Sequence, residues 1–129
     1  MPGGDDRLLL DLVKLEDARE DLAIHKSNKS GLLSLLNEVL VKTKAATIAN
    51  EKNEQLYRHS AKATNQEAIE MAAQALLKDD SAEIDKEAAR LAALAKAYTK
   101  VADQYKELVE ASKAKTKTVE SQINNLQNN

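Results

Sequence analysis

A stripe of small and apolar residues recurs at alternating spacings of four and three over the C-terminal third of the chain. About six heptads in one register are typical of a long helix with a continuous seam, and such a seam needs a partner helix. The stripe consists of Ile84, Ala88, Leu91, Ala95, Tyr98, Ala102, Tyr105, Val109, Ser112, Thr116, Val119, Ile123 and Leu126. This pattern predicts an all-α fold in which another helix covers the seam.

A second stripe with the same alternation precedes the first one in the chain. It consists of Leu33, Leu36, Leu40, Thr43, Thr47, Asn50, Glu54, Tyr57, Ala61, Thr64, Ala68, Met71 and Ala75. When the chain turns back at residues 79–81, large residues of one stripe meet small residues of the other, as close packing requires. Tyr57 falls opposite Ala102, and Ala61 opposite Tyr98. The two stripes therefore predict a long antiparallel helical hairpin, or coiled coil, with polar layers near its middle.

Glycine and proline occur only in the first quarter of the chain, and no residue of either type follows Gly31. Their absence favours uninterrupted helix beyond that point. We predict a single helical domain over residues 1–129, with helices at about 5–28, 32–78 and 81–126 and a turn at 79–81. The shorter first helix is expected to fold back through Gly31 and pack on the open end of the hairpin. Its Leu8, Leu12 and Leu15 would then cover Ile48.

The chain has few residues of the types that act in catalysis or bind metal ions. The chain has no cysteine, which excludes disulfides, thiolate metal sites and a cysteine nucleophile. His25 and His59 are far apart, and the Glu-x-x-His motif of di-iron bundles does not occur. No glycine-rich phosphate loop can form after Gly31. We therefore expect no catalytic residues, no cofactor and no metal, and we do not expect an enzyme.

Several apolar residues lie beside the predicted seam rather than in it. An apolar flank on a bare two-helix arm is typical of a contact with another chain. This flank is our candidate partner-binding site, and it consists of Ile69, Leu76, Leu77, Leu94 and Val101. It predicts binding to protein helices, either of a second copy in a homo-oligomer or of a different partner.

Five lysines form the second candidate site. The predicted pairing of the two stripes brings together two stretches of the chain that contain these lysines and no acidic residue. The five lysines are Lys42, Lys44, Lys113, Lys115 and Lys117. Such a cluster could bind a polyanion. The acidic first helix, with seven acids against three bases from Asp5 to Ile24, would neutralise it if docked nearby. Nucleic-acid binding is disfavoured, since the chain has no Phe or Trp to stack on bases.

Apolar runs, such as residues 8–10, are far too short to cross a membrane. The N-terminus has no basic region, so we expect no signal peptide and a cytoplasmic location. Membrane-surface helices are usually basic, and the first helix here is acidic. Helix docking is therefore favoured over membrane binding for this segment.

In outline, a short N-terminal helix before a long alanine-rich and charged hairpin resembles bacterial phage-shock and ESCRT-III-type membrane-remodelling proteins. It is similar also to the hairpins of prefoldin-type chaperones and to coiled-coil subunits of secretion, phage or tethering assemblies. The resemblance implies an alternative function as a peripheral membrane-remodelling or polymer-forming protein. It assigns no functional residue in this chain.

Overall fold

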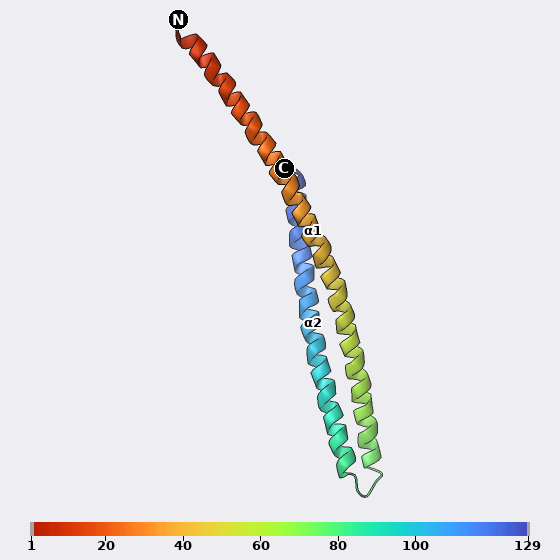
Figure 1. Cartoon of the computed structure of the whole chain (residues 1–129). Coiled ribbons are helices and arrows are strands. Elements are labelled where there is room, and N and C mark those ends of the chain that lie inside the picture. The colour runs from red at the N-terminus through yellow and green to blue at the C-terminus, as the bar shows by residue number, and fades with distance from the viewer. Residues whose placement is uncertain (1, 129) are drawn as a thin grey trace. The chain divides into compact units, whose positions relative to one another are not determined.

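The computed structural model describes the backbone of residues 2–128 and the side chains of residues 26–128. It contains two helices, α1 (Pro2–Ala75) and α2 (Ala82–Asn128), joined by residues 76–81 (Figure 1). No strand occurs between residues 2 and 128. The prediction of an all-α chain is confirmed, with α2 beginning one residue after the predicted start and α1 ending at Ala75 rather than near Lys78.

The chain divides into two compact units. One is Val41–Thr118, which holds most of both helices and the connection between them. The other combines Met1–Leu40 with Val119–Asn129.

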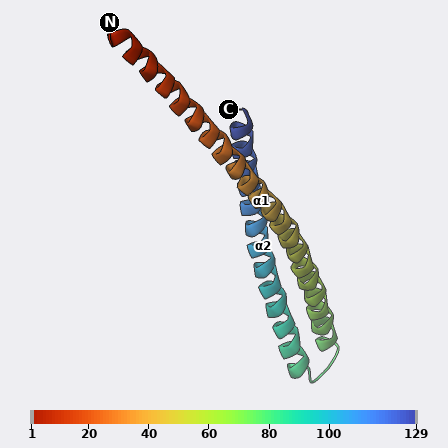
Figure 2. The same cartoon turned by 45° about the horizontal axis from the view of Figure 1, so that its top comes forward.

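Within Val41–Thr118, α1 and α2 lie side by side, as both views show (Figures 1 and 2). Every buried residue of this unit belongs to one of the two sequence stripes. These residues are Thr43, Ala61, Ala68, Ala75, Ala88, Leu91, Ala95, Ala102 and Val109. Most of them are alanines, whose small side chains allow two helix backbones to approach closely. The packed stripes form the core of this unit.

The largest side chains of the core surround its most buried residue. Ala102 has no exposed surface. The Tyr57 ring lies 6.0 Å from the Tyr98 ring and 5.7 Å from the Tyr105 ring, centroid to centroid. Because Tyr98 and Tyr105 flank Ala102 by one helical turn on each side, Tyr57 sits over Ala102. Aromatic pairs at these distances contribute about 0.5–1.5 kcal/mol each beyond their burial.

The second unit has a smaller core of branched aliphatic residues. Val119 and Ile123 of α2 are buried. Leu33, Leu36 and Leu40 of α1 and Leu126 of α2 are half-buried. All of these residues were predicted seam positions.

The predicted break between residues 28 and 32 is wrong, because α1 continues through it. Gly31 does not adopt a positive φ, and a Cβ added there would meet no atom within 4 Å. Glycine inside a helix costs only about 1 kcal/mol relative to alanine, which flanking helix-forming residues can offset. The segment 5–28 is therefore part of α1 and not a separate helix that folds back. The predicted contacts of Leu8, Leu12 and Leu15 lie outside the described side chains.

A continuous α1 predicts that Gly31→Ala stabilises the protein by about 0.5–1 kcal/mol, because alanine loses less backbone entropy in a helix. Thermal unfolding followed by circular dichroism measures this gain. The reverse change at an exposed α1 position, Ala45→Gly, should cost a similar amount. A loss of stability in Gly31→Ala would instead indicate a helix end at Gly31 with a left-handed glycine.

The close approach at Ala102 predicts that Ala102→Leu destabilises the protein by about 1–3 kcal/mol, since the added methylenes have no space beneath Tyr57. Chemical denaturation measures the difference. Ala93→Leu is the matched control, because Ala93 lies on the same helix and is exposed. Equal stability of the two variants would contradict the packing of Tyr57 over Ala102.

Candidate functional site

The seam contains a polar stretch in which hydroxyl groups are satisfied within their own helices. The Thr47 hydroxyl donates to the Thr43 carbonyl at 3.0 Å, and the Thr116 hydroxyl donates to the Ser112 carbonyl at 2.9 Å. Thr43 is the only buried polar residue among those described, at 7% exposure. Asn50 is half-buried in the same stretch. Polar groups at seam positions lower stability and favour one register.

Ion pairs connect the two helices along one side of the seam. Arg58 of α1 donates to Glu54 of its own helix at 2.8 Å and to Asp103 of α2 at 3.1 Å. Lys113 of α2 lies 3.5 Å from the Glu51 carboxylate of α1. We call the side that bears Glu51, Arg58, Asp103 and Lys113 the ion-pair edge. These bridges orient the helices but contribute little to stability, because their charges are solvated.

The charges in this network favour their ionised forms. The hydrogen bond to Glu54, followed by the bond to Asp103, raises the pKa of Arg58. On α2, the hydrogen bond from Arg90 lowers the pKa of Glu87, and the same bond raises the pKa of Arg90. Both arginines therefore stay in their charged forms over the working pH range.

The other side of the seam carries apolar residues of α2. Three apolar residues of α2 each come one residue before a buried seam residue; they are Leu94, Val101 and Leu108. By contrast, Asp103 and Lys113 each come one residue after a seam residue. One residue is a rotation of about 100°, so the two groups lie on opposite sides of α2. We call Leu94, Val101 and Leu108 the apolar edge. Leu94 and Val101 are half-buried, and Leu108 is 51% exposed.

The predicted partner-binding residues therefore fall into separate groups. Leu94 and Val101 belong to the apolar edge. Ile69 follows the buried seam residue Ala68, which places it toward the ion-pair edge, whereas Leu76 and Leu77 lie in the connection just after the end of α1. Ile69 is 62% exposed, and Leu76 and Leu77 are each 88% exposed. Leu108 was missed, although its spacing of seven from Val101 could have indicated it.

The five predicted lysines are all exposed and divide in the same way. Lys44, Lys113 and Lys117 each follow a seam residue and lie toward the ion-pair edge. Lys42 and Lys115 each precede a seam residue and lie toward the opposite side. Val41 and Ile48, which are 68% and 61% exposed, also lie toward the ion-pair edge, one turn before and after Lys44. This combination of lysines with branched apolar residues was not recognised from the sequence.

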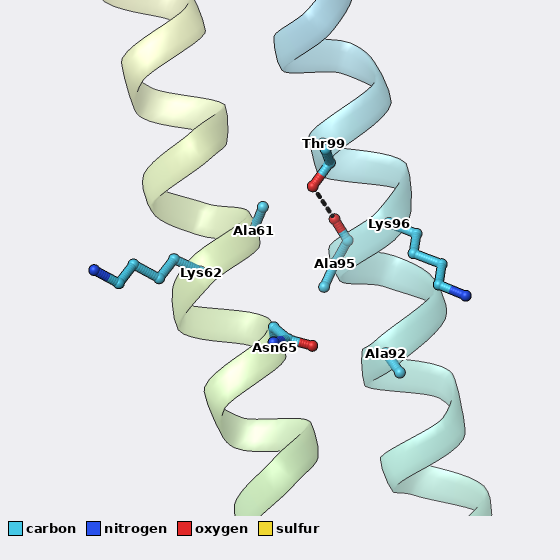
Figure 3. Close-up of a pocket in the computed structure, with 7 residues that line it drawn as sticks. All are labelled: Ala61, Lys62, Asn65, Ala92, Ala95, Lys96 and Thr99. Carbon is cyan, nitrogen blue, oxygen red and sulfur yellow. Dashed lines mark hydrogen bonds between the residues drawn. The ribbon is translucent and has the colours of Figure 1, made fainter.

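A pocket of about 340 Å³ opens between the helices on the ion-pair edge (Figure 3). It is lined by Ala61, Lys62, Asn65, Ala92, Ala95, Lys96 and Thr99. The Thr99 hydroxyl donates to the Ala95 carbonyl at 3.0 Å, and the amines of Lys62 and Lys96 point away from the space. With its amines turned outward and its hydroxyl already bonded, the pocket is a gap between small residues rather than an anion site.

The smaller unit has a more apolar pocket of about 310 Å³. Leu32, Leu36 and Leu126 supply its apolar wall, and Gln122 and Asn125 supply polar groups. Leu32 is 45% exposed. The pocket can accommodate an apolar side chain but offers no charged group to select a ligand.

Across the described side chains, no three His, Asp or Glu residues come close enough together to hold a metal ion. No helical stretch in the described part of the chain is both long and apolar enough to cross a membrane. Comparison with known proteins found no matching family model, no matching curated protein and no matching solved structure.

The polar stretch of the seam predicts that Asn50→Leu raises the melting temperature, because leucine buries apolar surface where an amide is now half-buried. It should also broaden the range of oligomers, since a polar constraint on register is lost. Circular dichroism and light scattering measure the two effects. Asn53→Leu, at an exposed position three residues along α1, should change the melting temperature little. Unchanged stability in Asn50→Leu would place Asn50 outside the packed seam.

Proposed function

We propose that this chain forms an antiparallel coiled-coil hairpin that works as a non-enzymatic assembly module. Its function is to present apolar helix surface to another helix, either of a second copy or of a different protein. The observation that carries this proposal is the exposure of Leu76 and Leu77, each 88% accessible at the end of α1. Large apolar side chains grouped on a surface are typical of interaction sites.

The amount of exposed apolar surface is sufficient to drive association. Full burial of Ile69, Leu76 and Leu77 would contribute about 1.5–3 kcal/mol for each side chain. A symmetric contact uses the same residues twice, so the total is comparable to the cost of about 4–15 kcal/mol for bringing two proteins together. Leu94 and Val101 add to the contact if a partner helix reaches the apolar edge.

The sequence also suggests two other functions. A polyanion binder would use the lysine cluster, but these lysines are divided between two sides of the helix pair and Lys113 already contacts Glu51. A peripheral membrane-remodelling or polymer-forming protein would use self-association in the same way as the proposed module. The assembly function is therefore the proposal that needs the fewest additional assumptions.

The double substitution Leu76→Ser with Leu77→Ser tests the proposal. It should weaken self-association at least tenfold in sedimentation velocity experiments while the helical content stays unchanged, because both residues lie outside the helices and the core. Leu56→Ser is the control, since Leu56 is 63% exposed and lies elsewhere on α1. A wild-type chain that stays monomeric at millimolar concentration would exclude self-association and leave binding to a different protein.

A further inference from the structure

The apolar edge of α2 continues across the seam onto α1. Glu51 and Lys113 each come one residue after a seam residue and contact each other, so these positions of the two helices meet on the ion-pair edge. The positions one residue before each seam residue therefore meet on the opposite side of the helix pair. In residues 46–63 of α1 and 94–111 of α2 none of these positions is charged, and we call them the uncharged face.

The uncharged face exposes apolar surface. Leu56 of α1 is 63% exposed and Leu108 of α2 is 51% exposed, while Leu94 and Val101 are half-buried. Most of its other positions hold exposed alanines, which allow the backbone of a further helix to approach closely. The face has the composition of a helix-packing surface, and nothing within the described part of the chain covers it.

Charges of opposite sign stand at the two ends of the uncharged face. At the next positions away from the connection lie Lys42 of α1 and Lys115 of α2, both exposed. At the next positions toward the connection lie Glu67 and Glu70 of α1, also exposed. A glutamate and an arginine of α2 at this end pair with each other; they are Glu87 and Arg90. The face is therefore basic at one end and acidic at the other.

These charged ends determine which occupant fits the face and in which direction it lies. A second copy of this chain brings the same face with the same two ends. In a parallel arrangement of the two copies, acids would meet acids at one end and lysines would meet lysines at the other. In an antiparallel arrangement, the basic end of each copy meets the acidic end of the other. Charge complementarity therefore favours an antiparallel second copy.

The residue sizes on α1 fit one register of this arrangement. Placing Lys42 opposite Glu70 of the other copy also places Ala49 opposite Ala63. Leu56 then lies opposite its own counterpart, beside a two-fold axis. The alanines on either side of this axis leave space for the two leucine side chains to pack against each other.

The same two-fold axis fits α2. Because the Tyr57 ring lies over Ala102, an axis beside Leu56 crosses α2 near Ala102. Leucines of one copy then face alanines of the other, as close packing requires. These pairs are Leu94 with Ala111 and Leu108 with Ala97.

We propose that two copies associate through their uncharged faces with the helix pairs antiparallel, so that the two helices of each copy pack on those of the other. One two-fold axis satisfies the contacts of both helices, as in an isologous dimer. The lysines at one end of each copy then lie against the glutamates at the opposite end of the other. This inference rests on the proposed function and names its partner and its contact surface.

Charge reversal at the two ends tests the docking. The lysine-end variant carries Lys42→Glu and Lys115→Glu, and the glutamate-end variant carries Glu67→Lys and Glu70→Lys. In sedimentation velocity experiments at low salt, each variant alone should dimerise at least tenfold more weakly than the wild type, because like charges then meet at both ends. An equal mixture should form a heterodimer with near wild-type affinity. Variants that dimerise like the wild type, or a mixture that does not recover, would overturn the antiparallel docking.

Each reversal variant has a control that makes the same change in net charge outside the uncharged face. Lys62→Glu with Lys96→Glu matches the lysine-end variant, and Glu107→Lys with Glu110→Lys matches the glutamate-end variant; all four residues are exposed. Both controls should keep near wild-type affinity. An equal loss of affinity in the controls would attribute the effect to net charge and overturn the pairing of the ends.

A thiol cross-link tests the register, because the chain has no cysteine. Ala49 and Ala63 are exposed and lie about 21 Å apart along α1, at about 1.5 Å per residue. A mixture of the Ala49→Cys and Ala63→Cys chains should give a covalent dimer with a short thiol-to-thiol cross-linker, whereas neither chain should do so alone. Equal yields in the mixture and in the separate chains would contradict the proposed register.

Leu108→Lys tests the apolar part of the face. It should weaken dimerisation at least tenfold without loss of helical content, because Leu108 is 51% exposed and its new charge would face an alanine of the other copy. Ile48→Lys is the matched control, since Ile48 is 61% exposed and lies toward the ion-pair edge. Equal affinities of the two variants would overturn the uncharged face as the contact.

The outcomes separate this inference from the proposed function. Leu56→Ser leaves the end of α1 unchanged and removes a contact beside the two-fold axis. Association that is weakened by Leu56→Ser and by Leu108→Lys supports the uncharged face as the contact. Association that is weakened only by Leu76→Ser with Leu77→Ser overturns it and leaves the assembly function in place. A wild-type chain that is monomeric at millimolar concentration overturns the docking and leaves binding to a different protein.

Discussion

The close contact between the stripes of α1 and α2 is the constraint on which the rest of the structure depends. It is made by alanines over much of its length, and the Tyr57 ring lies over Ala102, which has no exposed surface. Small residues bring the backbones close enough for Arg58 to reach Asp103. The tyrosines fill the space where the seam turns polar. Without this close approach, neither edge of the helix pair would exist as a surface.

The edges differ because the residues next to the seam differ. Charged residues of both helices meet on the ion-pair edge, whereas the opposite side of α2 carries Leu94, Val101 and Leu108. A seam built largely from alanine buries little apolar area per residue, and among the described residues many leucines and isoleucines lie outside the core. This distribution supports the proposal that the isolated pair of helices is a component of a larger assembly.

The core could be predicted from the sequence because helix periodicity alone determines which residues share a face. All buried residues among those described are seam positions read from the spacing of four and three. The ends of the helices were less predictable. Gly31 was interpreted as a helix end, yet the cost of about 1 kcal/mol for one glycine is small beside the cooperative gain of extending a helix on both sides of it. The glycine alone therefore led to a wrong prediction of the helix boundary.

The sequence by itself determined the helical content and the two faces that pack, because both follow from residue spacing within one segment. Only the tertiary structure decided which exposed residues share a surface. Ile69 was grouped with Leu94 and Val101 in the sequence, but the ion pairs Arg58–Asp103 and Glu51–Lys113 show which sides of α1 and α2 meet. That relation divides the apolar flank and the lysine cluster between two edges. It depends on how the two helices face each other across the seam, which no spacing within a single helix can specify.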